Sequence, residues 1–266
     1  MSDQKKLFRG TFLLTAATFT TQLLGMLYLI PFYSIMGGEE NLALYGYAYT
    51  PYTIMLSIAA AGVPGAVSKF VAKYNALGAY ETSRKHYKSS LNVMMVTGIL
   101  AFLALFFLAP YIAEAQSAAG GSGDHRCSSD DIASVIRVVS FAVIVVPFMA
   151  TWRGIFQGHE SFGPTSASSV VEQILRIVVL LSGAYIVINV MGGSIKTANQ
   201  IAVFAAFIGA IGATITLAIF WKKRRPMMQE QTATDKSGIS LSYVDMYKEI
   251  IRYGLPFIIV SVSIPV

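Results

Sequence analysis

Two residues of opposite charge lie inside one apolar segment and could form a gating or binding site. Glu172 and Arg176 are four residues apart in the segment 167–190. A helix therefore places them on one face with the glutamate first, the better order for pairing. Charged side chains within a membrane span are costly and are candidates for function. The same spacing also fits a structural ion pair that seals a helix bundle, so both interpretations stay open.

Arg137 is another charged residue inside an apolar segment, 132–151. No carboxylate stands three or four residues from it, and Asp130 and Asp131 are about two turns back. The side chain either extends outward past these two acids or faces a wet cavity that holds an anion. We favour the cavity, which makes Arg137 a candidate anion-binding residue.

Helix-weakening residues mark a possible hinge. They are Gly62, Pro64 and Gly65 in the segment 44–68, and Pro147 in the segment 132–151. Proline removes a helical hydrogen bond, and broken helices often mark substrate sites or hinges in transporters. We predict that these residues let a helix bend. The alternative is a helix that tolerates them because its neighbours satisfy the freed backbone groups.

The sequence offers little support for metal binding, an internal disulfide or enzymatic catalysis. The three histidines, His86, His125 and His159, have no partner at the spacing of metal ligands. The single cysteine, Cys127, cannot form an internal disulfide. No nucleophile, base and acid converge in the sequence. We therefore expect neither a metal, a cofactor nor an enzymatic activity.

The composition indicates a membrane protein. Hydrophobic residues make up 55% of the 266 residues and charged residues only 13%, whereas soluble domains carry about 25% charged residues. This excludes an ordinary soluble domain and a disordered chain. The net charge of +6 does not indicate a nucleic-acid partner, because the basic residues form short clusters between apolar runs instead of one polar face.

The elements that must position the charged residues are membrane helices. A helix needs about 20 residues to cross the hydrocarbon core, and six runs are long enough: about 11–33, 44–68, 91–113, 132–151, 167–190 and 198–221. We assign residues 1–221 to a six-helix transmembrane lobe and 222–252 to a cytoplasmic linker with an amphipathic lead-in helix. Residues 253–266 are expected to begin a seventh helix that is cut short. The predicted fold class is an all-α integral membrane protein.

Basic residues concentrate on alternate connections and predict the orientation. These connections are the N-terminus with Lys5, Lys6 and Arg9, residues 69–90, residues 152–166, and residues 222–252, which open with Lys222, Lys223, Arg224 and Arg225. The positive-inside rule places all of them in the cytoplasm. The acidic connection 114–131 is then on the outside.

Three stretches resemble the lipid II flippases of the MurJ type, a branch of the multidrug/oligosaccharidyl-lipid/polysaccharide (MOP) exporter superfamily. They are RGTFLLTAATFTTQLLGMLYLIPFYSIMG, AGVPGAVSKFVAKYNALGAYETSRKHYKSSL and TWRGIFQGHESFGPTSASSVVEQILRIVVLLSGAYIV. The resemblance spans nearly the whole chain and extends to a sporulation relative, stage V sporulation protein B.

The resemblance implies a fold and a function. The fold would be a MATE-like one, with two six-helix lobes facing a central cavity. This chain would supply the N-terminal lobe, and the C-terminal lobe would be missing. The implied function is to flip a lipid-linked cell-wall precursor, lipid II, from the inner to the outer leaflet by alternating access. The implied partners are lipid II, membrane lipids, the second lobe and cell-wall synthesis proteins.

The resemblance also bears on the site. Gram-negative members place arginines in the first two helices, where Gln22, Tyr28 and Ser57 stand here. The positive charge for a pyrophosphate would then come from four other residues, Arg137, Arg153, Arg176 and Lys69. Glu172 would hold Arg176 or exchange partners during the cycle.

Two alternatives remain. A cation-coupled multidrug or other lipid-oligosaccharide exporter is the first, but a site for cationic drugs would need acidic residues, and Glu172 is the only carboxylate within the apolar runs. A non-transporting scaffold in a cell-wall synthesis complex is the second.

Overall fold

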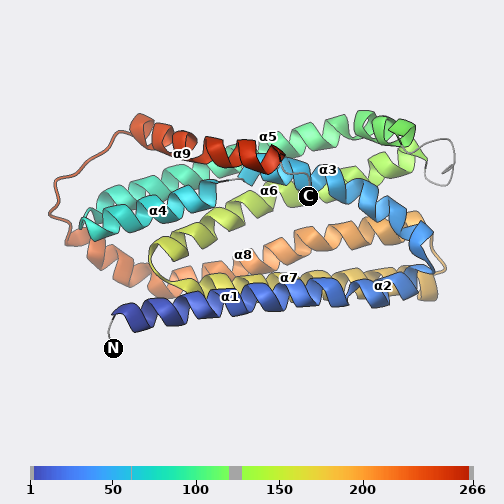
Figure 1. Cartoon of the computed structure of the whole chain (residues 1–266), viewed down its shortest axis with the longest axis horizontal. Helices are drawn as coiled ribbons and strands as arrows, with labels where there is room; N and C mark the ends of the chain where they lie inside the picture. Colours follow the sequence, from blue (N-terminus) through green and yellow to red (C-terminus); the bar gives the residue numbers. More distant parts are fainter. Residues whose placement is uncertain (1–2, 61, 120–127, 264–266) are drawn as a thin grey trace.

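The computed structural model describes residues 3–60, 62–119 and 128–263, and these residues form helices and short connections without a strand. His125, Cys127 and residues 264–266 lie outside the described residues. Most of the helices run lengthwise in one elongated bundle (Figure 1). The predicted all-α membrane fold is confirmed.

The helices follow one another with short breaks. They are α1 (Asp3–Leu27), α2 (Leu29–Met36), the 3-10 helix η1 (Glu39–Leu42), α3 (Ala43–Ala60), α4 (Val63–Ala76), α5 (Tyr80–Ala119), α6 (Ser129–Gly158), α7 (Phe162–Tyr185), the π-helical turn η2 (Ile186–Val190), α8 (Ile195–Ala233) and α9 (Tyr243–Ser263). Among the described residues, six stretches are long and apolar enough to cross a membrane. They are Phe8–Met36, Glu40–Ala76, Tyr80–Ala118, Ser129–Gly158, Phe162–Val190 and Ile195–Ala233.

Two helices extend far beyond the apolar runs that predicted them. α5 begins at Tyr80 instead of near residue 91, and α8 continues to Ala233 instead of ending near residue 221. Lys, Arg, Gln and Met are good helix formers, so a helix that a membrane span has nucleated continues through them into the polar region. The 39 residues of α8 span about 58 Å, roughly twice the hydrocarbon thickness.

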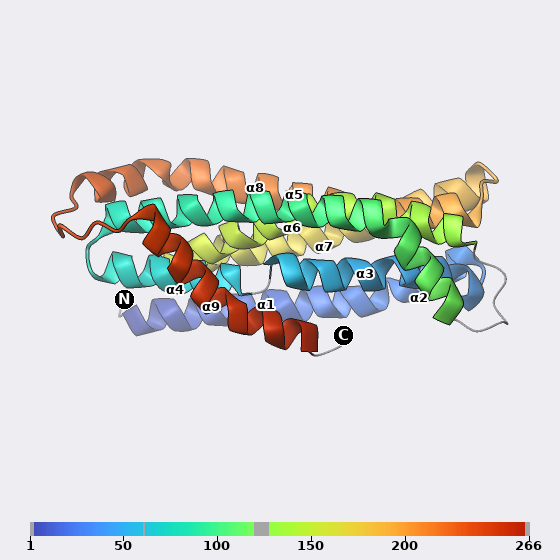
Figure 2. The same ribbon diagram turned by 90° about the horizontal axis from the view of Figure 1, so that it is seen from above.

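The expected cytoplasmic linker is therefore mostly helical. Within 222–252, the first part belongs to α8, and only residues 234–242 connect it to α9. The expected lead-in helix and the start of a seventh membrane helix form one helix, α9, which crosses over α3, α4 and α5 (Figure 2). α9 passes residue 253 without interruption, because Tyr243–Ser263 keeps helical geometry throughout, and the start of a membrane helix at residue 253 stays a prediction.

The middle of the bundle is formed by α6, which packs against α3, α4, α5 and α8. Its side chains Val135, Ile136, Val139 and Val143 are fully buried in the largest apolar cluster. In contrast, α1 contacts chiefly α7 and exposes large apolar side chains such as Phe12 and Phe19. Exposed apolar faces of this extent fit contact with lipid.

Glycines set the closest approach of α6 to α4. A Cβ atom on Gly154 would collide with the carbonyl oxygen of Pro64, and one on Gly158 would lie 2.7 Å from the carbonyl oxygen of Ser68. Small residues four apart allow two helix backbones to touch in this way. The contact fixes α4 directly after the point where the second apolar segment is broken.

Candidate functional site

The charged residues of α6 and α7 meet in one cluster, which we call the Arg–Glu–Arg cluster (Arg153, Glu172 and Arg176). Glu172 accepts a 2.8 Å hydrogen bond from Nη2 of Arg176 through Oε1 and a second one, also of 2.8 Å, from Nη2 of Arg153 through Oε2. The first contact spans one helical turn of α7, and the second joins α7 to α6. One carboxylate thus holds two guanidinium groups.

Neighbouring residues fix the cluster. Nε of Arg153 donates a 2.9 Å hydrogen bond to Oγ of Ser168, which itself donates to the carbonyl oxygen of Thr165. On the other side, α8 approaches at Gly209, where a Cβ atom would lie 2.8 Å from the carbonyl oxygen of Glu172. Arg153 is therefore held by two side chains of α7, and close packing of α8 supports the backbone of Glu172.

The cluster carries an excess of positive charge. Its two arginines and one glutamate sum to one positive charge, and their side chains are only 18%, 13% and 18% exposed for Arg153, Glu172 and Arg176. Nε of Arg176 is buried and has no hydrogen-bond partner among the described residues. In a medium of low dielectric constant such a cationic centre attracts an anion strongly.

Tyrosines of α3 lie close to Arg176. The rings of Tyr45 and Tyr49 stack at 5.3 Å between centroids, and Tyr52 follows at 5.4 Å from Tyr49. All three hydroxyl groups are near enough to interact electrostatically with Arg176. Tyr28, between α1 and α2, approaches the hydroxyl group of Tyr45 at 3.5 Å. A polar tyrosine row thus adjoins the cationic cluster.

The two other predicted cationic residues lie elsewhere. Arg137 is exposed on α6, with its guanidinium carbon 5.8 Å from the centre of the Phe106 ring, and makes no ion pair with a described residue. Lys69 is exposed on α4 and lies over the ring of Tyr253 at 4.3 Å. The four residues expected to share one anion site are thus divided among three places.

The predicted hinge residues differ in their surroundings. α3 ends at Ala60 and α4 begins at Val63, and Gly62 has φ +75°, a left-handed conformation that favours glycine. Pro64 lies in the first turn of α4, where its missing N–H costs nothing. Gly65 is helical, and Pro147 lies within the unbroken helix α6. The break is thus at Gly62, and its role as a hinge stays a prediction.

A second polar cluster ties α9 to the bundle. Glu249 accepts hydrogen bonds of 3.0 and 3.2 Å from the hydroxyl group of Tyr74, and Nζ of Lys73 lies 3.9 Å from it. Nε2 of His86, a fully buried side chain, is 3.8 Å from the same carboxylate. This cluster connects α4, α5 and α9, and no pattern in the sequence indicated it.

Sequence reasoning also missed the link between Arg153 and Glu172. Ser168, Gly154 and Gly158 are the residues from which this contact could have been predicted, since small and polar residues at helical spacing mark close helix contacts. Among the described residues, no group of three His, Cys, Asp or Glu side chains could hold a metal ion.

Comparisons with known proteins agree with this architecture. Residues 7–266 match the family described as polysaccharide biosynthesis protein. The chain is 46% identical over 260 residues to the lipid II flippase MurJ of Bacillus subtilis, covering 98% of this chain and 47% of that protein. It is 28% identical over 169 residues to stage V sporulation protein B of the same organism, covering 64% of this chain and 30% of that protein.

The fold matches solved transporters. A MOP superfamily transporter from Pyrococcus furiosus superposes with a TM-score of 0.72 at 18% identity, over 99% of this chain and 56% of that one. The chain spans about half the length of the relatives that it matches.

Proposed function

Because this chain belongs to the polysaccharide biosynthesis protein family, whose match covers residues 7–266, we propose that it forms the N-terminal lobe of a flippase that moves lipid II from the inner to the outer leaflet. The observation that supports this most directly is the 46% identity to the Bacillus subtilis lipid II flippase along 98% of the chain. The activity is transport and not catalysis. A second lobe supplies the opposite wall of the transport cavity.

The Arg–Glu–Arg cluster is the proposed centre for the pyrophosphate. A pyrophosphate cannot enter hydrocarbon without compensation, because even one unpaired charge is costly there. Guanidinium groups bind phosphate through paired hydrogen bonds. Glu172 orients Arg153 and Arg176 in the absence of cargo, and the excess positive charge remains for the anion.

The alternative of a cationic-drug exporter is less well supported. Such a transporter needs a net negative site, and the charged cluster within this bundle holds two cations for one carboxylate.

Arg137 and Lys69 lie apart from the cluster and have secondary roles. Arg137 meets the anion near the outer end of α6, and Lys69 meets it at the cytoplasmic end of α4. The break at Gly62 supplies the bending that alternating access requires.

The proposed orientation follows the charge pattern. The N-terminus lies in the cytoplasm of a bacterial cell, and the protein crosses the plasma membrane several times. The connections after α4, α6 and α8 also lie on the cytoplasmic side. Cell-wall synthesis proteins are the expected partners.

A complementation experiment tests the function. The chain is joined to the second half of the Bacillus subtilis flippase and expressed in cells depleted of lipid II flippase activity. We expect growth with this chimera and none with the chain alone. The matched variant is Arg153→Ala with Arg176→Ala, which should abolish growth. The proposal is wrong if the chimera reaches the membrane in the amount of the intact Bacillus protein and cells still fail to grow.

A further inference from the structure

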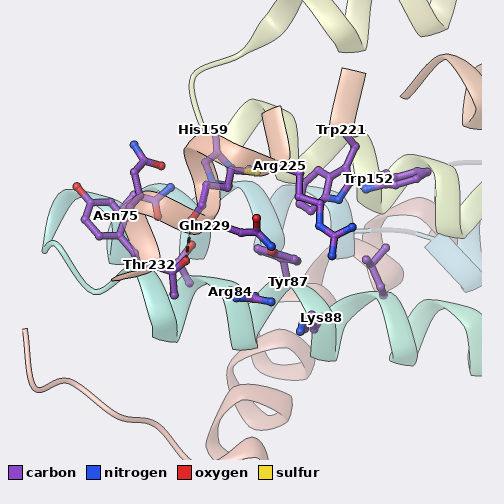
Figure 3. A pocket seen from close by; sticks show the side chains of 15 residues that line it. Asn75, Arg84, Tyr87, Lys88, Trp152, His159, Trp221, Arg225, Gln229 and Thr232 are labelled. Atoms are coloured by element: carbon purple, nitrogen blue, oxygen red, sulfur yellow. Dashed lines mark hydrogen bonds between the residues drawn. The ribbon is translucent and has the colours of Figure 1, made fainter. Parts of the chain in front are cut away.

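A cavity of about 330 Å³ lies at the end of the bundle where α5, α6 and α8 meet. It shares no residue with the Arg–Glu–Arg cluster. Figure 3 shows Arg84, Tyr87 and Lys88 of α5 on one side and Trp221, Arg225 and Gln229 of α8 on the other. The extension of α8 beyond residue 221 creates this cavity, since Arg225 and Gln229 belong to the part that composition assigned to a linker.

All charged side chains that line the cavity are positive. Arg84, Lys88 and Arg225 line the cavity, and no aspartate or glutamate does. None of these three cations forms an ion pair with a described residue. The nearby Glu81 is 2.9 Å from Lys85, which does not line the cavity. Three uncompensated cations around one hollow create a strong positive potential there.

A buried hydroxyl group gives an independent indication of a ligand. Ser83 lines the same cavity with a side chain that is only 2% exposed, and its Oγ has no hydrogen-bond partner among the described residues. A buried polar atom without a hydrogen-bond partner destabilises the folded chain. A ligand oxygen in the cavity would satisfy this hydroxyl group.

Part of the wall is aromatic, with Tyr87, Trp152 and Trp221 among the lining residues. Trp221 meets the rings of Tyr87, Phe156 and Trp152 with centroids 5.4, 6.0 and 6.2 Å away. Amphipathic aromatic side chains of this kind are typical of the membrane interface, the depth at which lipid head groups lie. The position at the helix ends agrees with that depth, since the cavity also reaches Asn75 at the end of α4 and His159 after α6.

We propose that this cavity, with Arg84, Lys88 and Arg225 around the unpaired hydroxyl group of Ser83, binds a phosphate group. The proposal does not depend on the transport function. The phosphate group belongs either to an anionic lipid of the leaflet that surrounds the cavity or to a soluble phosphorylated molecule. Both ligands present phosphate oxygens to the three cations.

Tryptophan fluorescence provides a direct measurement, because both tryptophans of the chain, Trp152 and Trp221, line the cavity. The purified chain in a non-ionic detergent is titrated with short-chain phosphatidylglycerol, with inorganic pyrophosphate, and with zwitterionic short-chain phosphatidylcholine. We expect a saturable change in emission with at least one of the two anions and a much weaker response to phosphatidylcholine. A response to phosphatidylglycerol alone identifies a lipid as the source, and a response to pyrophosphate identifies a free phosphate.

Variants connect the signal to the site. The triple change Arg84→Gln, Lys88→Gln and Arg225→Gln should weaken the apparent affinity by a factor of ten or more. The control Lys222→Gln with Lys223→Gln removes exposed charges of the same helix that do not line the cavity, and should leave it within a factor of two or so. Ser83→Ala tests the hydroxyl group without a change of charge and should weaken binding severalfold.

Two results would overturn the proposal. The first is the absence of a saturable response to either anion while circular dichroism shows an intact helical fold. The second is an equal loss of affinity in the triple variant and in the Lys222/Lys223 control, which would mean that general surface charge attracts the anion.

Discussion

Nη2 of Arg153 donates a 2.8 Å hydrogen bond to Oε2 of Glu172 across the interface of α6 and α7, although the residues are 19 positions apart in the chain. Because Arg176 donates to the other oxygen of the same carboxylate, the two guanidinium groups share Glu172 as their counter-ion. This dependence leads to a specific expectation for the energetics of the cluster.

Glu172→Gln should lower the free energy of unfolding by about 3–5 kcal/mol, since it leaves two mostly buried arginines without their anion. Arg153→Gln should show coupling to Glu172→Gln in a double-mutant cycle, measured by unfolding in mixed detergent micelles. Arg137→Gln is the control and should be additive with Glu172→Gln, because Arg137 forms no ion pair with a described residue. Additivity of Arg153→Gln would contradict the bridge.

Gly154→Ala should destabilise the protein by about 1–3 kcal/mol, because its Cβ atom would meet the backbone carbonyl of Pro64, which cannot move aside easily. Gly163→Ala is the matched control: Gly163 is also helical, and nothing lies within 4 Å of its added Cβ atom. The control should be neutral or stabilise by up to about 1 kcal/mol. In the same detergent, the melting temperature of Gly154→Ala should therefore fall clearly, whereas that of Gly163→Ala should stay unchanged or rise.

Gly62→Ala and Gly65→Ala distinguish the role of the backbone break at Gly62 from a general effect of replacing glycine by alanine. Gly62 has φ +75°, so an alanine there costs about 1 kcal/mol or more, whereas Gly65 is helical with open space at its Cβ position. In the complementing chimera, we expect Gly62→Ala to slow growth and Gly65→Ala to leave it unchanged. Equal growth of both variants at equal membrane levels would show that bending at Gly62 is not needed.

Cys127, the single cysteine, tests the proposed orientation. It lies in the acidic connection that the charge pattern places outside, so a membrane-impermeant maleimide should label it in intact cells. A Cys127→Ser, Ser240→Cys chain moves the thiol to an exposed position between α8 and α9, and this chain should be labelled only after lysis. The reverse labelling pattern would invert the topology.

His159 predicts a dependence of stability on pH. Burial lowers the pKa of His159, nearby Arg224 lowers it further, and the contact of Nδ1 with the carbonyl oxygen of Ile155 opposes this only in part. The unfolded chain, with a histidine pKa of about 6.5, therefore binds a proton at a higher pH than the folded chain does. Stability from this group is complete above that value and falls as the pH decreases below it.

The measurement compares unfolding at neutral and mildly acidic pH for the unchanged chain and for His159→Gln. The difference in stability between the two pH values should be smaller in the variant. His125→Gln, at a position in the connection between α5 and α6, is the control and should keep the pH dependence. An unchanged slope in His159→Gln would show that other groups cause the dependence.

Much of the architecture follows from the sequence alone. Long apolar runs must satisfy every backbone group internally in lipid, so composition is sufficient to predict membrane helices. The proximity of Glu172 and Arg176 also follows from the sequence, because the helical repeat places residues four apart on one face.

Only the tertiary structure determined which charges meet. Arg153 joins Glu172, while Arg137 faces Phe106 and Lys69 faces Tyr253, although all lie in or beside apolar runs. The rotation and register of one helix against another depend on packing, here on the contact of Gly154 with Pro64 and of Gly209 with Glu172. Hydropathy also could not predict that α8 continues past the membrane and closes a cavity beside α5, because helix formation there depends on propagation from the span and not on apolar character.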